Sequence, residues 1–459
     1  MLSIHTTNHR KKVAFKPLVE GAVSMYVCGP TVYDKGHLGH GRSAVAFDMV
    51  RRYLMYRKFK VTYVSNYTDI DDKMINRAAE RGISVPELAE EIIPLYVRDF
   101  GELRVLPADV SPRATEFVPQ MIELIGELEL KGLTYVISDG VYFDVSKFEM
   151  YGALSGQQME DLQAGARKEV NMEKRNHQDF VLWKMAKSGE PAWASPWGSG
   201  RPGWHIECSA MVRSVLGQPI DIHGGGLDLT FPHHECEIAQ SEAAYGVKFA
   251  QYWLHNGFVN INKEKMSKSL HNFITLEDVL KVYEGRVIRF LYLQTHYRSP
   301  LDFSEEMLEQ SKNGLARVDQ FIALLRHYTP ADDAIDLSVF FDQYRELFIT
   351  AMDNDFDMPG ATGVMFSFIN FCQDLLKRKI FSQENVLEVL GFMDELDAVF
   401  AILSREKHDI PESVMVLINE REQVRKDRNF KRSDEIREEL KTQGFEVEDT
   451  SDGPMVKRI

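Results

Sequence analysis

The chain has 459 residues, of which 44% are apolar, four are cysteine, and the formal net charge is −15. At roughly 100–200 residues per domain, this length allows three or four domains with a large core. The negative charge argues against non-specific coating of nucleic acid, because phosphates would be repelled; a nucleic-acid partner would need a local basic face. Four cysteines make a poor disulfide framework, so we expect ligands, nucleophiles or small core residues, and for Cys372 a core position.

Membrane insertion and secretion are not expected. No apolar run approaches the ~18 residues that span a bilayer, and the start, "MLSIHTTNHRKK", lacks the layout of a secretory signal. The sequence therefore predicts a cytoplasmic protein without a membrane partner.

The first elements predict a parallel sheet. "SMYVCG" (24–29) and "KVTYVSN" (60–66) are typical of strands, and "GRSAVAFDMVRRYLMYR" (41–57) between them has helical apolar spacing. A βαβ unit of this kind places a ligand crevice at the carboxyl ends of its strands.

The sequence pattern changes between about residues 112 and 200, and this change predicts an insertion into the first domain. It contains a helix near "EFVPQMIELIGELELKG", short strands at "TYVIS" and "VYFDV", and a Trp- and Pro-rich stretch. The strand pattern resumes at "IDIHGGG" (220–226) and "YWLHNGFVNI" (252–261), so we expect a sheet that is split in sequence.

The chain after Thr275 is predicted to be helical almost to its end. Thr275 and Asp278 form a capping-box start to "LEDVLKVYEGRVIRFLYLQ", and Ser304 begins another long helix. Further helices cover about 338–404, and the last unit has two charged helices and a hairpin with its turn at "SDG".

Two motifs suit a nucleotide. "CGPTVYDKGHLGHGRS" (28–43) places His37 and His40 around Gly39 at a helix start, where anions are favoured, although the same residues would also serve as an N-terminal cap. "KEKMSKSLHNF" (263–273) supplies Lys265 and Lys268, which could stabilise a departing pyrophosphate or simply be solvated.

A third motif, "FPHHECEIAQ" (231–240), holds five candidate metal ligands in consecutive positions, His233 to Glu237. In a helix opened by Pro232, His233 and Glu237 lie four residues apart on one face, and Cys236 lies three from His233. Zinc accepts Cys, His and carboxylate ligands, usually four. The spacing does not choose between Cys236 and Glu237.

Together, "HLGH" and "KMSKS" resemble the two signatures of class I aminoacyl-tRNA synthetases. "YVCGPTVYDKGHLGH", "NYTDIDDK", "RPGWHIECSAM", "DIHGGG" and "FPHHE" are similar to segments of the cysteinyl-tRNA synthetases. The resemblance is dense from about 22 to 300. One departure is His271, where that family has glycine after "KMSKSL", so the flexibility of this loop could differ.

The resemblance implies an α/β fold in which a Rossmann-like, parallel-sheet catalytic domain is split by an insertion and followed by a helical bundle domain and a small C-terminal α+β anticodon-binding unit. The expected bounds are 1–112 and 201–262 for the catalytic halves, 113–200 for the connective insertion, 263–315 for the KMSKS loop and stem-contact region, 316–404 for the bundle and 405–459 for the C-terminal unit.

The implied activity is the joining of L-cysteine to the 3′ end of its tRNA through cysteinyl-adenylate, with ATP and magnesium, by a monomer that needs no editing site. The resemblance implies one zinc per chain, which binds the substrate thiolate and is held by Cys28, Cys208, His233 and Glu237. His37, His40, Lys265 and Lys268 are the implied catalytic residues, and with Gly39 they bind ATP. The implied substrate contacts are Gly29, Thr68, Trp204, His223 and Asp228.

Other interpretations remain open at this point. The nearest is a ligase with the same core that joins cysteine to a small amino-sugar acceptor, although about 190 residues follow Ser269 and favour tRNA. A zinc hydrolase would leave both signatures unexplained, and a non-catalytic RNA-binding module fits the acidic charge poorly. The C-terminal basic stretch has interleaved acids and is equally typical of a solvated helix: Arg421, Arg425, Lys426, Arg428, Lys431 and Arg432.

Overall fold

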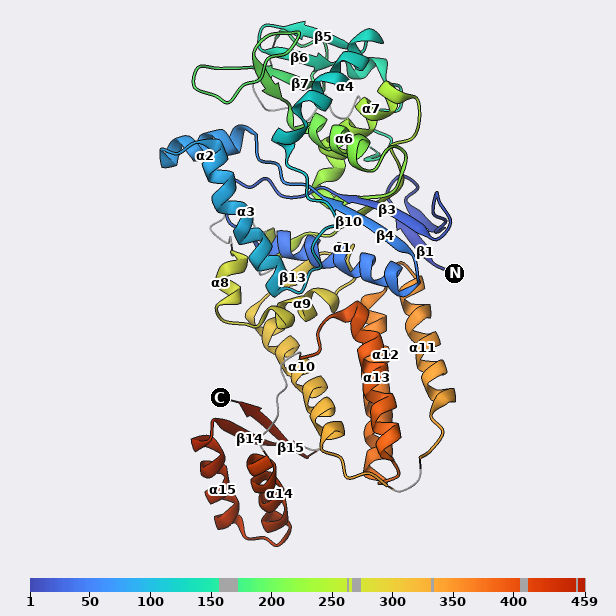
Figure 1. Ribbon diagram of the computed structural model, residues 1–459, viewed down its shortest axis with the longest axis vertical. Helices are drawn as coiled ribbons and strands as arrows, with labels where there is room; N and C mark the ends of the chain where they lie inside the picture. Colours follow the sequence, from blue (N-terminus) through green and yellow to red (C-terminus); the bar gives the residue numbers. More distant parts are fainter. Residues whose placement is uncertain are drawn as a thin grey trace.

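The computed structural model describes residues 1–156, 172–261, 264–265, 274–331, 334–404, 412–450 and 453–458. Figure 1 shows an elongated molecule with four regions stacked along its long axis. An antiparallel sheet with flanking helices lies at one end, the parallel sheet comes next, a bundle of long helices follows, and a small C-terminal unit lies at the other end.

The central sheet is parallel and has the strand order β10-β9-β3-β4. Its strands are β3 (Ala22–Val27), β4 (Lys60–Ser65), β9 (Ile220–Gly226) and β10 (Ala250–Asn256), and α1 (Leu38–Tyr56) joins the first two. The predicted βαβ unit and the split of the sheet in sequence are confirmed, as is the α/β fold class. The hairpin of β1 (Ser3–Thr6) and β2 (Lys11–Ala14) lies beside this sheet in Figure 1.

The region between the two halves forms a separate antiparallel sheet of order β5-β6-β7-β8. Its strands are β5 (Thr134–Ile137), β6 (Gly140–Phe143), β7 (Phe180–Met185) and β8 (Gly200–Pro202). The helix α4 (Val118–Leu130) packs against α6 (Trp204–Val215) and α7 (Glu235–Tyr245), so this unit is continuous with the helices that follow β8 and β9. The helices α2 (Asp72–Arg81) and α3 (Val85–Glu102) follow β4 in the chain and precede this unit.

Two local expectations were wrong. The expected strand over 252–261 is two strands, β10 and β11 (Val259–Ile261), which belong to different sheets. Gly257 separates them, and a Cβ there would lie 2.4 Å from the Ser299 carbonyl oxygen, so the chain passes too close to its neighbour to continue straight. β11 pairs with β12 (Glu264–Lys265) and with β13 (Leu301–Phe303).

The second is the single helix expected after Thr275. It divides into α8 (Leu276–Leu280) and α9 (Gly285–Leu293), because Gly285 packs where a Cβ would lie 2.0 Å from the Glu102 carbonyl oxygen. The Thr275 cap is confirmed, since its hydroxyl accepts a bond from the Asp278 amide at 3.1 Å. The strand expected over 220–226 is confirmed as β9 and includes all three glycines; a Cβ on Gly224 would meet the Phe47 ring at 2.4 Å.

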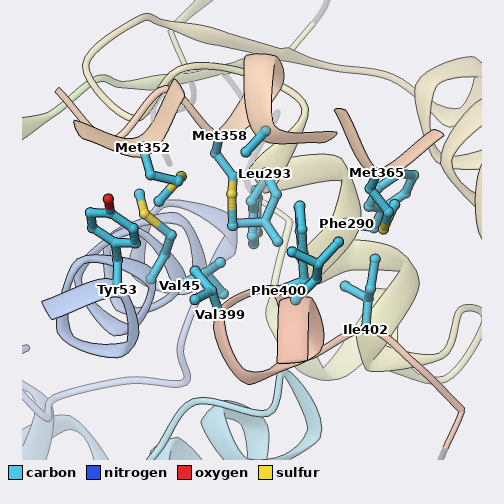
Figure 2. Close-up of a cluster of buried hydrophobic side chains, with 14 of the residues drawn as sticks. Val45, Tyr53, Phe290, Leu293, Met352, Met358, Met365, Val399, Phe400 and Ile402 are labelled. Atoms are coloured by element: carbon cyan, nitrogen blue, oxygen red, sulfur yellow. The ribbon is translucent and has the colours of Figure 1, made fainter. Parts of the chain in front are cut away.

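The helical bundle shares one hydrophobic core with the catalytic sheet. It consists of α10 (Glu305–Arg326), α11 (Ser338–Asp353), α12 (Met358–Lys377) and α13 (Gln383–Phe400). Figure 2 shows Val45 and Tyr53 of α1 and Phe290 of α9 facing Met352, Met358 and Phe400 from the bundle. Cys372 is buried in this core, as expected. The bundle therefore packs directly against the helix that begins at the first signature.

The C-terminal unit has its own small core. It contains α14 (Glu412–Lys426), α15 (Phe430–Thr442) and the hairpin of β14 (Phe445–Thr450) and β15 (Gly453–Arg458), which confirms the expected two helices and hairpin. The expected turn at Ser451 and Asp452 lies outside the described residues. Within the described part of the chain, no helix combines the length and apolarity needed to cross a membrane.

Candidate active site

A cavity of about 670 Å³ opens at the carboxyl ends of the parallel strands. The last residue of each strand lines it: Val27 of β3, Ser65 of β4, Gly226 of β9 and Asn256 of β10. This is the position in which open parallel sheets bind ligands. Ten of the residues predicted from the sequence also line it: Cys28, Gly29, His37, Gly39, His40, Thr68, Trp204, Cys208, Asp228 and His233.

The first signature forms the start of α1. His37 is the N-cap: its ring Nδ1 accepts a hydrogen bond from the Gly39 amide at 3.1 Å, and the His37 amide donates to His40 Nδ1 at 3.2 Å. The two rings stack with centroids 3.7 Å apart. The capping role and a ligand-binding role therefore coexist, since both rings line the cavity beside an amino terminus that favours phosphate.

The segment that follows the second signature forms backbone hydrogen bonds with the first signature. The Leu38 amide donates to the Ile274 carbonyl at 3.3 Å, and the Leu276 amide donates to the Gly36 carbonyl at 2.9 Å. Lys35 also forms an ion pair with Glu277. Lys265 is the last residue of β12, and its side chain is not described; Lys268 and His271 lie outside the described residues.

Four side chains meet below the cavity, three of them buried and Cys28 partly buried: Cys28 after β3, Cys208 on α6, His233 in the short turn η4 (Thr230–His234), and Glu237 on α7. Their nearest donor atoms all lie within 4.8 Å of one another. The Sγ atoms of Cys28 and Cys208 are 3.6 Å apart, Cys28 Sγ lies 3.4 Å from Glu237 Oε1, and Cys208 Sγ lies 3.7 Å from His233 Nε2. A tetrahedron with zinc bonds of ~2.0–2.3 Å has edges of roughly 3.3–3.8 Å, so this donor set fits zinc.

The electrostatics of the cluster also suit a cation. Burial lowers the pKa of His233 to about 3, which leaves a neutral imidazole that can act as a ligand. Burial alone would raise the pKa of Glu237, but the facing imidazoles of His223 and His233 outweigh it and lower that pKa below its usual value. Burial raises the pKa of the Cys28 thiol well above its usual range, and a bound cation reverses that preference by taking the thiolate.

A second donor set shares two of these residues. It consists of Cys28, His223, His234 and Glu237, with His223 Nε2 at 3.0 Å from Glu237 Oε2 and 3.6 Å from Cys28 Sγ. The first set contributes Cys28, Cys208 and His233 to the cavity lining, whereas neither His223 nor His234 lines it. The first set is therefore the one placed to meet a ligand in the cavity.

Cys236 belongs to neither donor set among the described residues. Its Sγ lies 3.5 Å from the Tyr151 hydroxyl, and the side chain is fully buried. The thiol is a small core group, which favours Glu237 over Cys236 in the choice that spacing left open.

The expected substrate contacts divide into two groups. Gly29, Thr68, Trp204 and Asp228 line the cavity, and the indole of Trp204 stacks on His233 with centroids 4.2 Å apart. His223 is fully buried on the far side of the cluster, where it stacks on Tyr26. Its nearest described partners are the side chains of Glu237 and Cys28.

The acids in "NYTDIDDK" each have a described structural partner. Asp71 accepts from the Met74 amide at the start of α2, Asp69 accepts from the Thr115 amide, and Asp72 pairs with Lys184 and Arg201. These carboxylates fix the segment that carries Thr68.

Two polar residues at this edge were not predicted from the sequence. Asn66 accepts a hydrogen bond from the Gly29 amide at 2.9 Å, and Glu207 accepts one from the Thr68 hydroxyl at 2.9 Å. Both stand within quoted segments, Asn66 in "NYTDIDDK" and Glu207 in "WHIEC", immediately before Cys208. The signal available in the sequence was proximity to a predicted site residue: Glu207 directly precedes Cys208, and Asn66 stands two positions before Thr68.

Solved structures with this fold belong to several synthetases. Methionyl-tRNA synthetase of Mycobacterium tuberculosis in complex with methionyl-adenylate matches with a TM-score of 0.60 at 14% identity, over 83% of this chain and 90% of that one. A LeuRS–tRNA–LeuAMS ternary complex of Agrobacterium radiobacter K84 matches with a TM-score of 0.64 at 10% identity, over 84% and 85%. At these identities the likeness establishes the fold.

Sequence comparison gives the class and then the family. The family model described as tRNA synthetases class I (C) catalytic domain matches residues 14–313. "Cysteine--tRNA ligase" of Clostridioides difficile (strain 630) is 47% identical over 100% of both chains, and that of Thermococcus gammatolerans is 46% identical over 100% of this chain and 99% of its own. The chain belongs to the cysteine–tRNA ligase family of class I aminoacyl-tRNA synthetases.

Proposed function

We propose that the chain activates L-cysteine with ATP and transfers the cysteinyl group to the 3′ end of its tRNA. The observation that carries this proposal is the cluster of Cys28, Cys208, His233 and Glu237 at the floor of the cavity that His37 and His40 line. A thiol-selective metal site beside a phosphate-binding helix start suits the activation of an amino acid with a thiol side chain.

The proposed resident metal is zinc, held by those four side chains. When bound, zinc favours a thiolate over a hydroxyl or a methyl group, and this supplies the discrimination against serine, alanine and valine. Losing a metal–sulfur bond costs far more than the ~1–3 kcal/mol that one methylene offers, so a separate editing site is unnecessary.

In the first step, the substrate carboxylate attacks the α-phosphorus of ATP, and cysteinyl-adenylate and pyrophosphate form. Neither this step nor the next needs a nucleophile from the protein, so positioning and charge stabilisation supply the acceleration. His37 and His40 bind the triphosphate at the start of α1, next to Gly39. Lys265 and Lys268 stabilise the departing pyrophosphate, and magnesium accompanies the nucleotide.

In the second step, the terminal ribose hydroxyl of tRNA attacks the activated carbonyl, and AMP leaves. The bundle of α10 to α13 would lie along the inner side of the tRNA, with the C-terminal unit at the anticodon. Within that unit, Arg432 already pairs with Glu420, Glu435 and Glu439, so any RNA contact there would compete with intramolecular pairs. We further propose a monomeric, cytoplasmic enzyme and the six-part domain division given above.

The test is transfer of radiolabelled cysteine to unfractionated bacterial tRNA by the purified protein with ATP and magnesium. Acid-precipitable label is expected, together with its loss after chelation and its absence with serine. Cysteine-dependent AMP release only with a small amine acceptor would instead indicate the amino-sugar ligase.

A further inference from the structure

A chain of hydrogen bonds runs beneath the cavity and ends at a buried carboxylate. The Gly29 amide donates to Asn66 Oδ1 at 2.9 Å, Asn66 Nδ2 donates to the Thr68 hydroxyl at 3.3 Å, and that hydroxyl donates to Glu207 Oε2 at 2.9 Å. Gly29 and Thr68 line the cavity, whereas Asn66 and Glu207 lie behind them. The chain therefore connects two cavity residues to a residue on α6.

The Thr68 hydroxyl is held in one orientation by these bonds. A hydroxyl has one donor and two acceptor positions; here Glu207 takes the proton and Asn66 occupies one acceptor position. The backbone is also fixed, since the Thr68 amide donates to the Pro30 carbonyl at 3.1 Å and the Thr68 carbonyl accepts from the Val32 amide at 3.1 Å. What remains for the cavity is one acceptor, which suits an N–H donor and not a carboxylate.

Glu207 itself lacks a complete set of partners. It is fully buried, its Oε1 has no hydrogen-bond partner among the described residues, and the described ion pairs do not include it. The guanidinium of Arg201 is bound to Asp72 and Glu190. The Thr68 hydroxyl is therefore the one described hydrogen-bond partner of the Glu207 side chain, and this contact ties the two groups together.

We propose that Glu207 is a positioning residue, which holds the Thr68 hydroxyl as an acceptor for the α-ammonium group of the amino-acid substrate. The inference rests on the proposed function and extends it to a residue that does not touch the substrate. Because Glu207 and Cys208 are consecutive on α6, one helix turn sets both the ammonium end and the thiol end of the site.

The test compares three thiols by calorimetric titration of the purified, metal-assayed protein. L-Cysteine has the thiol, ammonium and carboxylate; cysteamine lacks the carboxylate; 3-mercaptopropionate lacks the ammonium. Thr68→Val and Glu207→Gln should each weaken cysteine and cysteamine about tenfold, the cost of a hydrogen bond to a charged group, and leave 3-mercaptopropionate within about twofold. Thr68→Ser, which keeps the hydroxyl, should recover most of the cysteine and cysteamine affinity that Thr68→Val loses. Thr442→Val, which removes an exposed hydroxyl of the C-terminal unit, is the matched control and should bind all three thiols like the unchanged protein.

Equal weakening of all three thiols would overturn the inference, because it would mean that the variants disturb the metal site, and so would unchanged binding of cysteine. Zinc content and thermal midpoint are measured on each variant, and Thr68→Val carries the test if Glu207→Gln does not fold. Failure of the proposed function is distinct: it would appear as absent cysteine-dependent ATP–pyrophosphate exchange in the unchanged protein.

Discussion

Charged groups are buried in two regions of this molecule, the junction between the catalytic sheet and the helical bundle, and the floor of the candidate active site. At the junction, Arg289 is fully buried, and its three guanidinium nitrogens donate to Asp48 and to the carbonyls of Leu103, Arg104 and Phe400. Asp48 also accepts from Arg52 at 2.7 Å.

At the floor of the candidate active site, polar side chains are buried as completely, but some of their atoms lack hydrogen-bond partners among the described residues. Glu207 Oε1, His223 Nδ1 and His234 Nε2 are buried without a hydrogen-bond partner among the described residues. Buried polar groups are normally paired, because an unpaired one costs about 1–3 kcal/mol. The junction pairs its buried charges across two domains, whereas the floor of the candidate site leaves buried polar atoms unpaired.

The largest effect is expected from removing a ligand at the site. Cys208→Ser should lower zinc affinity by at least about 100-fold, more than changes around a metal site usually cause, and should abolish cysteine-dependent exchange with it. Metal analysis and ATP–pyrophosphate exchange measure the two losses. Cys236→Ser, beside the cluster but outside it, should keep both; a zinc loss there equal to that of Cys208→Ser would contradict the ligand assignment.

At the junction, removal of one partner should instead cost stability. Asp48→Ala would leave Arg289 and Arg52 buried without their counter-ion, and we expect the free energy of unfolding to fall by about 3–5 kcal/mol in urea denaturation. Asp342→Ala removes a carboxylate from an exposed pair with Arg345 and should change it by less than about 1 kcal/mol. Similar values for both variants would remove the contrast between buried and exposed pairs.

A charged side chain that acts on the bound substrate should change the rate of adenylate formation without changing the stability of the fold. Lys268→Ala should slow adenylate formation by about 10²–10³-fold, the loss expected for one group that stabilises the transition state, while cysteine affinity and the urea midpoint stay unchanged. Lys312→Ala, on the exposed face of α10, is the control and should leave exchange unaltered. An unaltered exchange rate in Lys268→Ala would contradict the assignment of Lys268 as a catalytic residue.

The smallest effect concerns pH at the same junction. Burial alone would raise the pKa of Asp353, but hydrogen bonds from Tyr53 and Arg57 outweigh it and lower that pKa below its usual value. Stability from this carboxylate is therefore present above the unfolded pKa of ~3.9 and is lost as pH falls through the lower folded value.

The variant Asp353→Asn tests the direction of this dependence of stability on pH. Its thermal midpoint should lie below that of the unchanged protein at pH 7, and the difference should shrink as the pH falls below about 4, because both chains then lack the charge. A difference that stays constant down to pH 3 would show that the carboxylate contributes through its hydrogen bonds alone.

Prediction from the sequence succeeded where a local pattern is sufficient. The strands around β3, β4 and β9, the helix α1 and the C-terminal hairpin follow from period-two and period-3.6 spacing. It failed at Gly257 and Gly285, because at each position a remote backbone carbonyl approaches the glycine and decides where an element ends. Glu207 was missed for the same reason: its partner Thr68 is 139 residues away.

The sequence by itself determined the kinds of groups available, two signatures rich in His and Lys and a run of metal-binding side chains, because residue chemistry and short spacing are local properties. Only the tertiary structure decided which of them meet. Cys28 and Cys208 are 180 positions apart, and their sulfur atoms lie 3.6 Å apart because β9 pairs with β3 in the sheet and α6 packs beside that edge. Strand order, which no short stretch of sequence encodes, sets the distances on which the site depends.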